Sequence, residues 1–229
     1  MNKKKDLKNR KIKKRIVKSW AKLGNGHAVA IIGCGPSVNS LTAAQRTAIE
    51  QIYCIGINAA HKAIKCDMIL FQDFEYARNH KDYIIDNPDD VIFMCRDICC
   101  MIECEKMYNY RLEPGKWSKS PIGHPEILCG SGCSGITAVS LAVNLGFNPI
   151  ILIGMDGKYD EDGNTSFFGK NHLHTNQTLK NFNLGLSFVK REYSKDVKFY
   201  SLSDNDYFKR KNFNKVIKKI GIGKKIKLI

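Results

Sequence analysis

A glycine-rich turn, an apolar helix and an apolar strand follow one another in Cys129–Tyr159. The first N–H groups of a helix lack partners within the helix and carry a partial positive charge, so a turn of this kind can hold a phosphate group. The strand runs into Gly154-Met155-Asp156, and a carboxylate just past a strand lies where open α/β sheets bind their ligands. The combination indicates a transferase that uses a nucleotide.

A second glycine turn occupies Ile31–Ser37, with the sequence IIGCGPS, directly after an apolar run. Gly33 and Gly35 allow the backbone to come close to a ligand, and Pro36-Ser37 can lead into a helix while offering N–H and hydroxyl donors. The turn is neither the GxGxxG dinucleotide motif nor the Walker P-loop, because it lacks the third glycine and the Gly-Lys-Ser/Thr of those motifs. A tight strand-to-helix turn without a ligand is the alternative interpretation.

Polar residues end the next two apolar runs of the chain. Asn58 closes IGIN, and Gln72-Asp73 closes DMILFQD. The carboxyl ends of neighbouring parallel strands meet at one crevice, so we expect these side chains to converge there. An asparagine in that place can pair with a base or a ribose edge, whereas an aspartate can bind a ribose hydroxyl, a metal ion or an acceptor.

A polar loop over residues 155–175 contains the pair His172 and His174. A histidine suits general acid or base catalysis near neutral pH, because its ordinary pKa is about 6.5. Metal ligation by the pair would need a third ligand, and a surface or capping role is a further alternative. Lys158, Tyr159 and Lys170, in the same loop, carry groups that could neutralise a departing phosphate.

Short apolar runs separated by helical segments predict the elements that position these residues. They indicate an α/β fold, Rossmann-like, with a mostly parallel sheet flanked by helices. The expected strands are His27–Gly33, Ile52–Asn58, Asp67–Gln72, Asp90–Met94, Pro149–Gly154 and Asp196–Tyr200. The expected helices are Thr42–Ile49, a short link at His61–Ile64, Ser134–Leu145, and a helix with Phe182, Leu186, Val189 and Tyr193 on one face. Residues 95–128, rich in proline and aromatic side chains, break the rhythm and are interpreted as a lid-like insertion in a transferase domain of residues 25–207.

The net charge of +15 lies in the two ends of the chain. Residues 1–24 carry +10 and residues 208–229 carry +9, so the part between them is mildly acidic at −4. Both tails also have apolar residues at helical spacing, from Ile12 to Leu23 and from Phe213 to Ile220. A basic amphipathic helix of this kind suits an anionic membrane surface or, as the less favoured partner, nucleic acid. A solvated, partly disordered lysine-rich end is the alternative.

Nine cysteines without a signal peptide indicate free thiols in a reducing compartment. No apolar run reaches the roughly 18–20 residues of a spanning helix, so we expect a cytoplasmic protein, with peripheral association to the inner face of the membrane as an option that the tails leave open. The cluster Cys95, Cys99, Cys100 and Cys104 could suggest zinc, but its spacing lacks paired CxxC knuckles. Buried thiols on a helix shared with Ile102 are the favoured interpretation.

The order of the motifs resembles two related groups of proteins. GCGPS after the first strand, Asn58 after the second, Ser-Gly at the start of a helix, NPIILIGMD and a downstream histidine are similar to the bacterial lipooligosaccharide sialyltransferases. The segment CDMILFQDFEY resembles more closely the 6-hydroxymethylpterin diphosphokinase MptE-like family. The similarity extends over about residues 27–207 and leaves out both basic tails.

The sialyltransferase resemblance implies a nucleotide site and a catalytic base. The nucleotide contacts that it implies are Gly33, Cys34, Gly35, Pro36, Ser37, Asn58, Ser134 and Gly135, with Cys34 standing where the family has an asparagine; Gln72 and Asp73 join them as strand-end residues. The implied base is His174, with His172 as the second candidate, while Asp156 and Tyr159 would lie at the leaving phosphate.

Three hypotheses about function follow. The leading one is a glycosyltransferase that moves a sugar from a nucleotide-activated donor, CMP-sialic-acid-like or related, to a surface-glycan or small-molecule acceptor. The MptE-like alternative is a diphosphokinase that transfers diphosphate from ATP to a hydroxymethyl group with Mg²⁺, for which Asp73 and Asp156 are the candidate ligands. The third is a non-enzymatic nucleotide or nucleic-acid binding module. No redox cofactor is expected under any of them.

Overall fold

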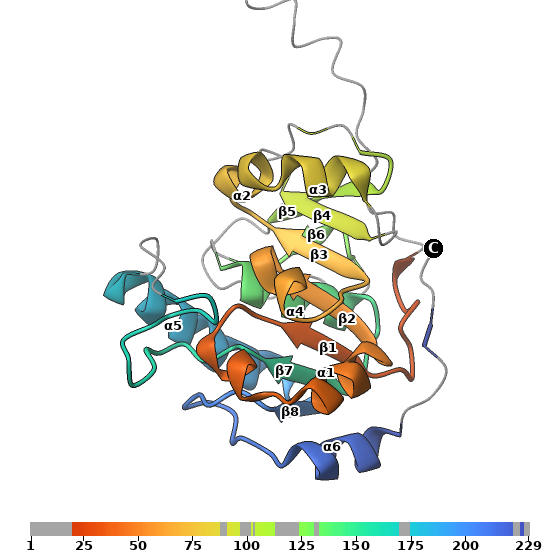
Figure 1. Ribbon diagram of the computed structural model, residues 1–229. Helices are drawn as coiled ribbons and strands as arrows, with labels where there is room; N and C mark the ends of the chain where they lie inside the picture. Colours follow the sequence, from red (N-terminus) through yellow and green to blue (C-terminus); the bar gives the residue numbers. More distant parts are fainter. Residues whose placement is uncertain are drawn as a thin grey trace, which may run out of the picture.

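The computed structural model describes residues 20–87, 91–96, 102, 104–112, 124–130, 133–169, 175–221 and 225–226. Within these ranges, eight parallel strands form one sheet in the order β6-β5-β4-β3-β2-β1-β7-β8 (Figure 1). The strands are β1 (Val29–Ile32), β2 (Tyr53–Ile57), β3 (Met68–Phe71), β4 (Ile92–Arg96), β5 (Met107–Leu112), β6 (Ile127–Leu128), β7 (Ile150–Ile153) and β8 (Phe199–Ser201). The expected α/β class with a parallel sheet is confirmed.

The direction in which strands are added reverses at the centre of the sheet. β1 pairs with β2 on one side and with β7 on the other, in parallel registers such as Ile31 with Ile55 and Ile31 with Leu152. Strands β2 to β6 therefore extend one way and β7 and β8 the other. A crevice opens beyond the carboxyl ends of two strands whose connections diverge in this manner, and open α/β sheets bind their ligands in that crevice.

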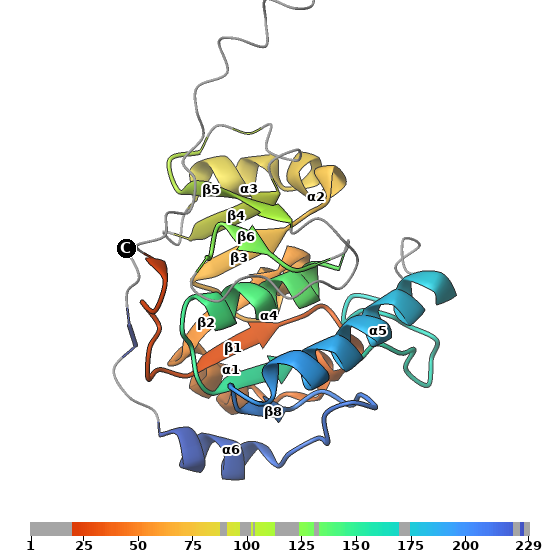
Figure 2. The ribbon, with the colours of Figure 1, turned by 180° about the vertical axis from the view of Figure 1, so that it is seen from behind.

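Helices cover both faces of the sheet (Figures 1 and 2). One face carries α1 (Ala43–Glu50), α2 (Phe74–Asn79), α3 (Lys81–Asp86) and α6 (Phe213–Ile220), together with the 3₁₀ helices η2 (Pro36–Ser40) and η3 (Asn58–Lys62). The other face carries α4 (Ser134–Asn144) and α5 (Asn176–Tyr193). Because both faces are covered, the four residues of β1 and the four of β7 are all buried, which explains their continuous apolar sequences.

Residues 95–128 differ from the prediction in the part that the structure describes. β4 continues to Arg96, so Cys95 lies in a strand and not on a helix, and its thiol donates a hydrogen bond to Asn109 Oδ1 at 3.1 Å. β5 and β6 add two strands to the sheet edge. The described part of the insertion thus extends the sheet. Residues 113–123 lie outside the described residues, and a lid there stays a prediction.

The apolar residues of the C-terminal tail pack on the body of the protein. In α6, Val216 is buried in the core cluster that also contains Ile32 of β1 and Phe71 of β3. Phe213, Ile217 and Ile220 pack against this cluster. Insertion of this apolar face into a bilayer would have to compete with that packing, so membrane association stays a prediction. Of the N-terminal arm, residues 1–19 lie outside the described residues. Among the described helices none is long and apolar enough to span a membrane.

Candidate functional site

A cavity of about 520 Å³ opens at the carboxyl ends of the central strands. It lies at the divergence between β1 and β7, where the topology predicts a ligand crevice. The sequence-predicted residues that line it are Gly33, Cys34, Gly35, Asn58, Gln72, Asp73, Ser134, Gly135 and Asp156. Residues far apart in the sequence therefore meet at one site, as the strand-end argument expects.

The floor of the cavity is a close contact between two backbone turns. Gly35 N–H donates to Gly154 O at 2.8 Å, and Gly33 N–H donates to Ile153 O at 2.7 Å. A Cβ on Gly33 would lie 2.2 Å from Gly154 O, and Gly154 itself has a φ of +64°. Gly33 permits this approach because it has no side chain. Gly154 permits it for the same reason and because glycine readily adopts the left-handed conformation.

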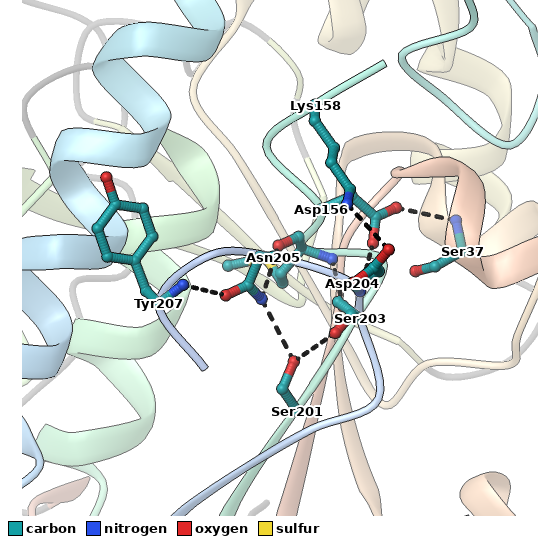
Figure 3. A network of polar contacts seen from close by, with 9 residues as sticks. Ser37, Asp156, Lys158, Ser201, Ser203, Asp204, Asn205 and Tyr207 are labelled. Carbon is teal, nitrogen blue, oxygen red and sulfur yellow. Dashed lines mark hydrogen bonds and ion pairs between the residues drawn. The ribbon is translucent and has the colours of Figure 1, made fainter. Parts of the chain in front are cut away.

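Asp156 joins the two turns through backbone hydrogen bonds. Its Oδ2 accepts the Ser37 N–H at 2.8 Å, and its Oδ1 accepts the Asp204 N–H at 3.3 Å (Figure 3). A Cβ on Gly35 would lie 2.3 Å from Asp156 Oδ2, so this glycine leaves room for the carboxylate. Through these contacts Asp156 holds the two turns together. Because both of its carboxylate oxygens face N–H groups, the contacts favour this structural role over the magnesium-ligand role of the diphosphokinase hypothesis. Among the described residues, no group of three or more His, Cys, Asp or Glu could hold a metal ion.

The pKa of Asp156 is raised, chiefly because burial disfavours its charged form, and the bonds from Ser37 and Asp204 only partly offset this. A carboxyl with a raised folded-state pKa stabilises the fold most when it is protonated, and this contribution is lost as pH rises from the unfolded-state pKa through the folded-state pKa. We therefore expect the stability advantage of the wild type over Asp156→Asn to grow as pH is lowered from 7 toward 3.8, the ordinary value. Urea unfolding of both proteins across this range measures the difference. An advantage that grows as pH rises would show that the hydrogen bonds outweigh burial.

The segment after β8 supports the turn that contains Asp156. The sequence did not identify this segment as part of the site. Ser203 Oγ accepts the Met155 N–H at 2.7 Å, and Asn205 Nδ2 donates to Met155 O at 3.3 Å. Lys158 Nζ lies 2.9 Å from Asp204 Oδ2 (Figure 3). Lys158, expected to neutralise a leaving phosphate, lines the cavity, and its ammonium already has a carboxylate partner.

Asn58 provides a polar group at the end of β2. It has a φ of +50°, a conformation that asparagine tolerates better than most residues, and its carbonyl oxygen lies 3.2 Å from His61 Nδ1. Its side-chain Oδ1 is buried with no hydrogen-bond partner among the described residues. A buried acceptor of this kind is costly unless a ligand or water completes it.

Cys34 lines the cavity as a protonated thiol. Burial raises its pKa to about 12, and its Sγ donates to Ile57 O at 3.2 Å. Because the thiolate is the nucleophilic form, Cys34 suits packing and weak hydrogen bonding in this wall, and not nucleophilic catalysis.

The start of α4 forms the opposite wall. Ser134 and Gly135 line the cavity, and the side chain of the N-cap residue Cys133 makes no cap hydrogen bond to the helix. A Cβ on Gly135 would lie 2.9 Å from Phe182 Cε2 and 3.0 Å from Met155 Cε. Gly135 therefore also allows α5 to pack closely against α4.

Some predicted site residues lie elsewhere. Pro36 and Ser37 begin η2 and are not part of the cavity lining, although Ser37 bonds to Asp156. Tyr159 is exposed, and its hydroxyl donates to Asn176 Oδ1 at 3.0 Å; it does not line the cavity. His172, His174 and Lys170 lie outside the described residues.

Other lining residues were missed by the sequence analysis. Phe74 and Glu75 directly follow Asp73, and Thr165 belongs to the polar loop. Thr178, Leu179 and Phe182 come from the first turns of α5. Phe182 was noted for its helical spacing, which marks it as a packing residue but cannot reveal the cavity that it borders.

No family model and no curated protein sequence matches the chain. Among solved structures, the MAf glycosyltransferase from Magnetospirillum magneticum AMB-1 aligns with a TM-score of 0.52 and 14% identity, over 85% of this chain. The chain spans about a third of that protein's length, with 36% of it covered.

Two structures of the sialyltransferase CstII from Campylobacter jejuni, with cytidine-5'-monophosphate and with CMP-3FNeuAc, align with TM-scores of 0.43. Their identities are 14% and 15%, over 78% and 77% of this chain and 81% and 80% of theirs. The alignment with the MAf protein shows a shared fold: this chain has the α/β fold of part of that glycosyltransferase.

Proposed function

We propose that the protein is a glycosyltransferase that binds a nucleotide-activated sugar in the cavity between β1, β7 and α4. The observation that carries this proposal is the cavity itself, which brings two glycine turns, the start of α4 and the buried Asn58 acceptor to one place. A glycosyltransferase with the same fold supports it. The anionic phosphate would lie at the start of α4, where N–H groups and the helix dipole favour negative charge.

The reaction requires a base and a stabilised leaving group. His174, or else His172, would take the proton of the acceptor hydroxyl, whose oxygen forms the new bond to the anomeric carbon. The bond between that carbon and the phosphate oxygen breaks, and the nucleotide leaves with the electron pair. The start of α4 would stabilise the charge that develops on the phosphate. In this proposal the donor is CMP-sialic-acid-like or related, and the acceptor is a surface glycan or a small molecule.

A thermal-shift panel with CMP, UDP, GDP and ATP, each with and without Mg²⁺, tests the proposal. At a ligand concentration of about 100 times Kd, binding stabilises the fold by about 2.7 kcal/mol, roughly 5–11 °C in a protein of this size. We expect CMP or UDP to give such a shift. ATP stabilisation that depends on Mg²⁺ would favour the diphosphokinase instead, and no shift with any nucleotide would overturn both.

Asn58→Gly provides the matched variant for this panel, because glycine keeps the positive φ and removes the side chain. We expect it to reduce the nucleotide-induced shift. Asn87→Gly is the control, since Asn87 also has a positive φ, of 38°, and it does not line the cavity. Equal loss of the shift in both variants would place the nucleotide elsewhere.

A further inference from the structure

Asn58 adopts a backbone conformation at the cavity that needs support. Its φ of +50° lies in the left-handed region, where residues other than glycine are uncommon and persist only when their surroundings hold them. Lys22 and Asn87 also have a positive φ, but neither lines the cavity. Among the described residues other than glycine, Asn58 is therefore where an unfavourable conformation and the candidate site coincide.

The two peptide groups that flank Asn58 are each held by a side chain. The carbonyl oxygen before it, Ile57 O, accepts a hydrogen bond from Cys34 Sγ at 3.2 Å. The carbonyl oxygen of Asn58 itself lies 3.2 Å from His61 Nδ1. The orientations of these two peptide planes determine where the Asn58 side chain points. Its Oδ1 has no hydrogen-bond partner among the described residues, so the backbone, and not a bond of this oxygen, sets its direction.

His61 makes its contact with Asn58 as a donor. A carbonyl oxygen can only accept, so Nδ1 carries the proton in this arrangement. Burial lowers the pKa of His61; the bond to Asn58 O raises it in part, and the nearby His80 and Lys62 lower it further. The ring is therefore neutral at pH 7. The form that holds Asn58 has a proton on Nδ1 and none on Nε2.

Aromatic neighbours fix the His61 ring in turn. It stacks on Tyr83 with 4.3 Å between the ring centroids and 11° between the planes. His80 meets it edge-on at 5.5 Å, and Tyr76 Oη lies 3.3 Å from Nδ1. His61 is not among the residues that line the cavity. An effect of His61 on a ligand therefore has to pass through a residue that does, and Asn58 is the one that it contacts by a hydrogen bond.

We propose that His61 is a positioning residue for nucleotide binding: its Nδ1–H holds the Asn58 carbonyl, and with it the left-handed conformation that places the Asn58 side chain at the cavity. The inference rests on the proposed function and adds a residue outside the cavity wall to the groups that determine nucleotide affinity. The ring also packs between η3, α2 and α3, so a test has to separate the donor from the ring.

Two substitutions make this separation. His61→Phe keeps a ring on Tyr83 and removes the donor, whereas His61→Asn removes the ring and keeps an N–H donor attached to Cγ, as Nδ1 is. Isothermal titration of the full chain with CMP and with UDP gives Kd, and thermal unfolding gives the melting temperature. For the nucleotide that the wild type binds, we expect His61→Phe to raise Kd about tenfold with little change in melting temperature. His61→Asn should stay within about threefold of the wild-type Kd and melt at a lower temperature.

A double-mutant cycle shows whether His61 acts through Asn58. Asn58→Gly keeps the positive φ and removes the side chain, so adding His61→Phe to it should change Kd by less than about twofold. The matched control is His80→Phe, because the His80 ring belongs to the same cluster but its Nδ1 contacts Tyr76 O, at 3.1 Å, and not Asn58. It should leave Kd unchanged.

Nitrogen NMR of the wild-type histidine rings at pH 7 tests the proposal without any variant. We expect His61 to carry its proton on Nδ1, and a proton on Nε2 alone would overturn the proposal. Equal Kd values for the wild type and His61→Phe would also overturn it, as would equal losses in His61→Asn and His61→Phe, an equal loss in His80→Phe, or additive losses in the cycle. A wild type that binds neither nucleotide refutes the proposed function as well, whereas wild-type binding that the His61 variants leave unchanged refutes only the role of His61.

Discussion

Replacing Gly33 with alanine is expected to lower the free energy of unfolding by about 3 kcal/mol, or roughly 6–12 °C in melting temperature. The new methyl group would lie 2.2 Å from Gly154 O and 2.9 Å from the Gly154 carbonyl carbon. Both atoms belong to a neighbouring backbone, so no side chain can rotate away to relieve the overlap. The turns after β1 and β7 would have to separate, and the Gly35–Gly154 hydrogen bond at 2.8 Å would be strained with them.

Chemical denaturation measures the loss, and nucleotide binding measures its consequence for the site. Cys34→Ala is the control, because it changes the residue between the two glycines without adding an atom and removes only the weak thiol bond to Ile57 O. We expect it to cost less than about 1.5 kcal/mol. If Gly33→Ala is as stable as Cys34→Ala, the close approach of the two turns does not require a glycine at position 33.

Replacing His174 with alanine is expected to reduce kcat by about 10²- to 10⁴-fold and to leave nucleotide binding unchanged. Loss of the base removes the proton acceptor for the attacking hydroxyl but none of the groups that hold the phosphate. Turnover of the donor identified by the nucleotide panel gives kcat, and the thermal shift gives binding. A variant that loses both would indicate a structural role for His174.

His172→Ala and His27→Ala are the matched controls for this experiment. His172 is the second candidate for the base, and His27 is exposed at the opposite end of β1. Retained turnover in His174→Ala together with loss in His172→Ala would move the role to His172. Loss in His27→Ala would show that the assay reports stability and not catalysis.

The strands at the centre of the sheet could be predicted because they are buried on both faces. β1, β2, β3 and β7 read as short, continuous apolar runs, and each was placed to within a few residues. β5 was missed because it mixes buried and more exposed residues without a regular alternation, with Tyr108, Arg111 and Leu112 only partly buried or exposed. A polar, mixed sequence of this kind gives no clear period, and only pairing with β4 makes it a strand.

The helices α2 and α3 were missed for a related reason. Each has six residues, too few to show a helical period in sequence and too short to be stable alone. They are stabilised by tertiary packing, since Tyr76, Ala77 and Ile84 all belong to the core on that face of the sheet. Residues at the start of α2 line the cavity, so this part of the cavity wall was missed together with its helix.

The amino-acid sequence alone specifies which segments can become the central strands, where the chain can turn tightly, and which polar residues follow the strands. These are local properties, because apolar runs, glycines and strand-end side chains act through their immediate neighbours. How these residues are used depends on contacts between distant segments of the fold. The fold joins Ser37 to Asp156 across 119 positions and Met155 to Ser203 across 48, and it brings α5 to the cavity wall. Such contacts depend on the order of strands in the sheet, which no local pattern specifies; for this reason Asp156 could be read from the sequence as a site residue, but not as the brace between two turns.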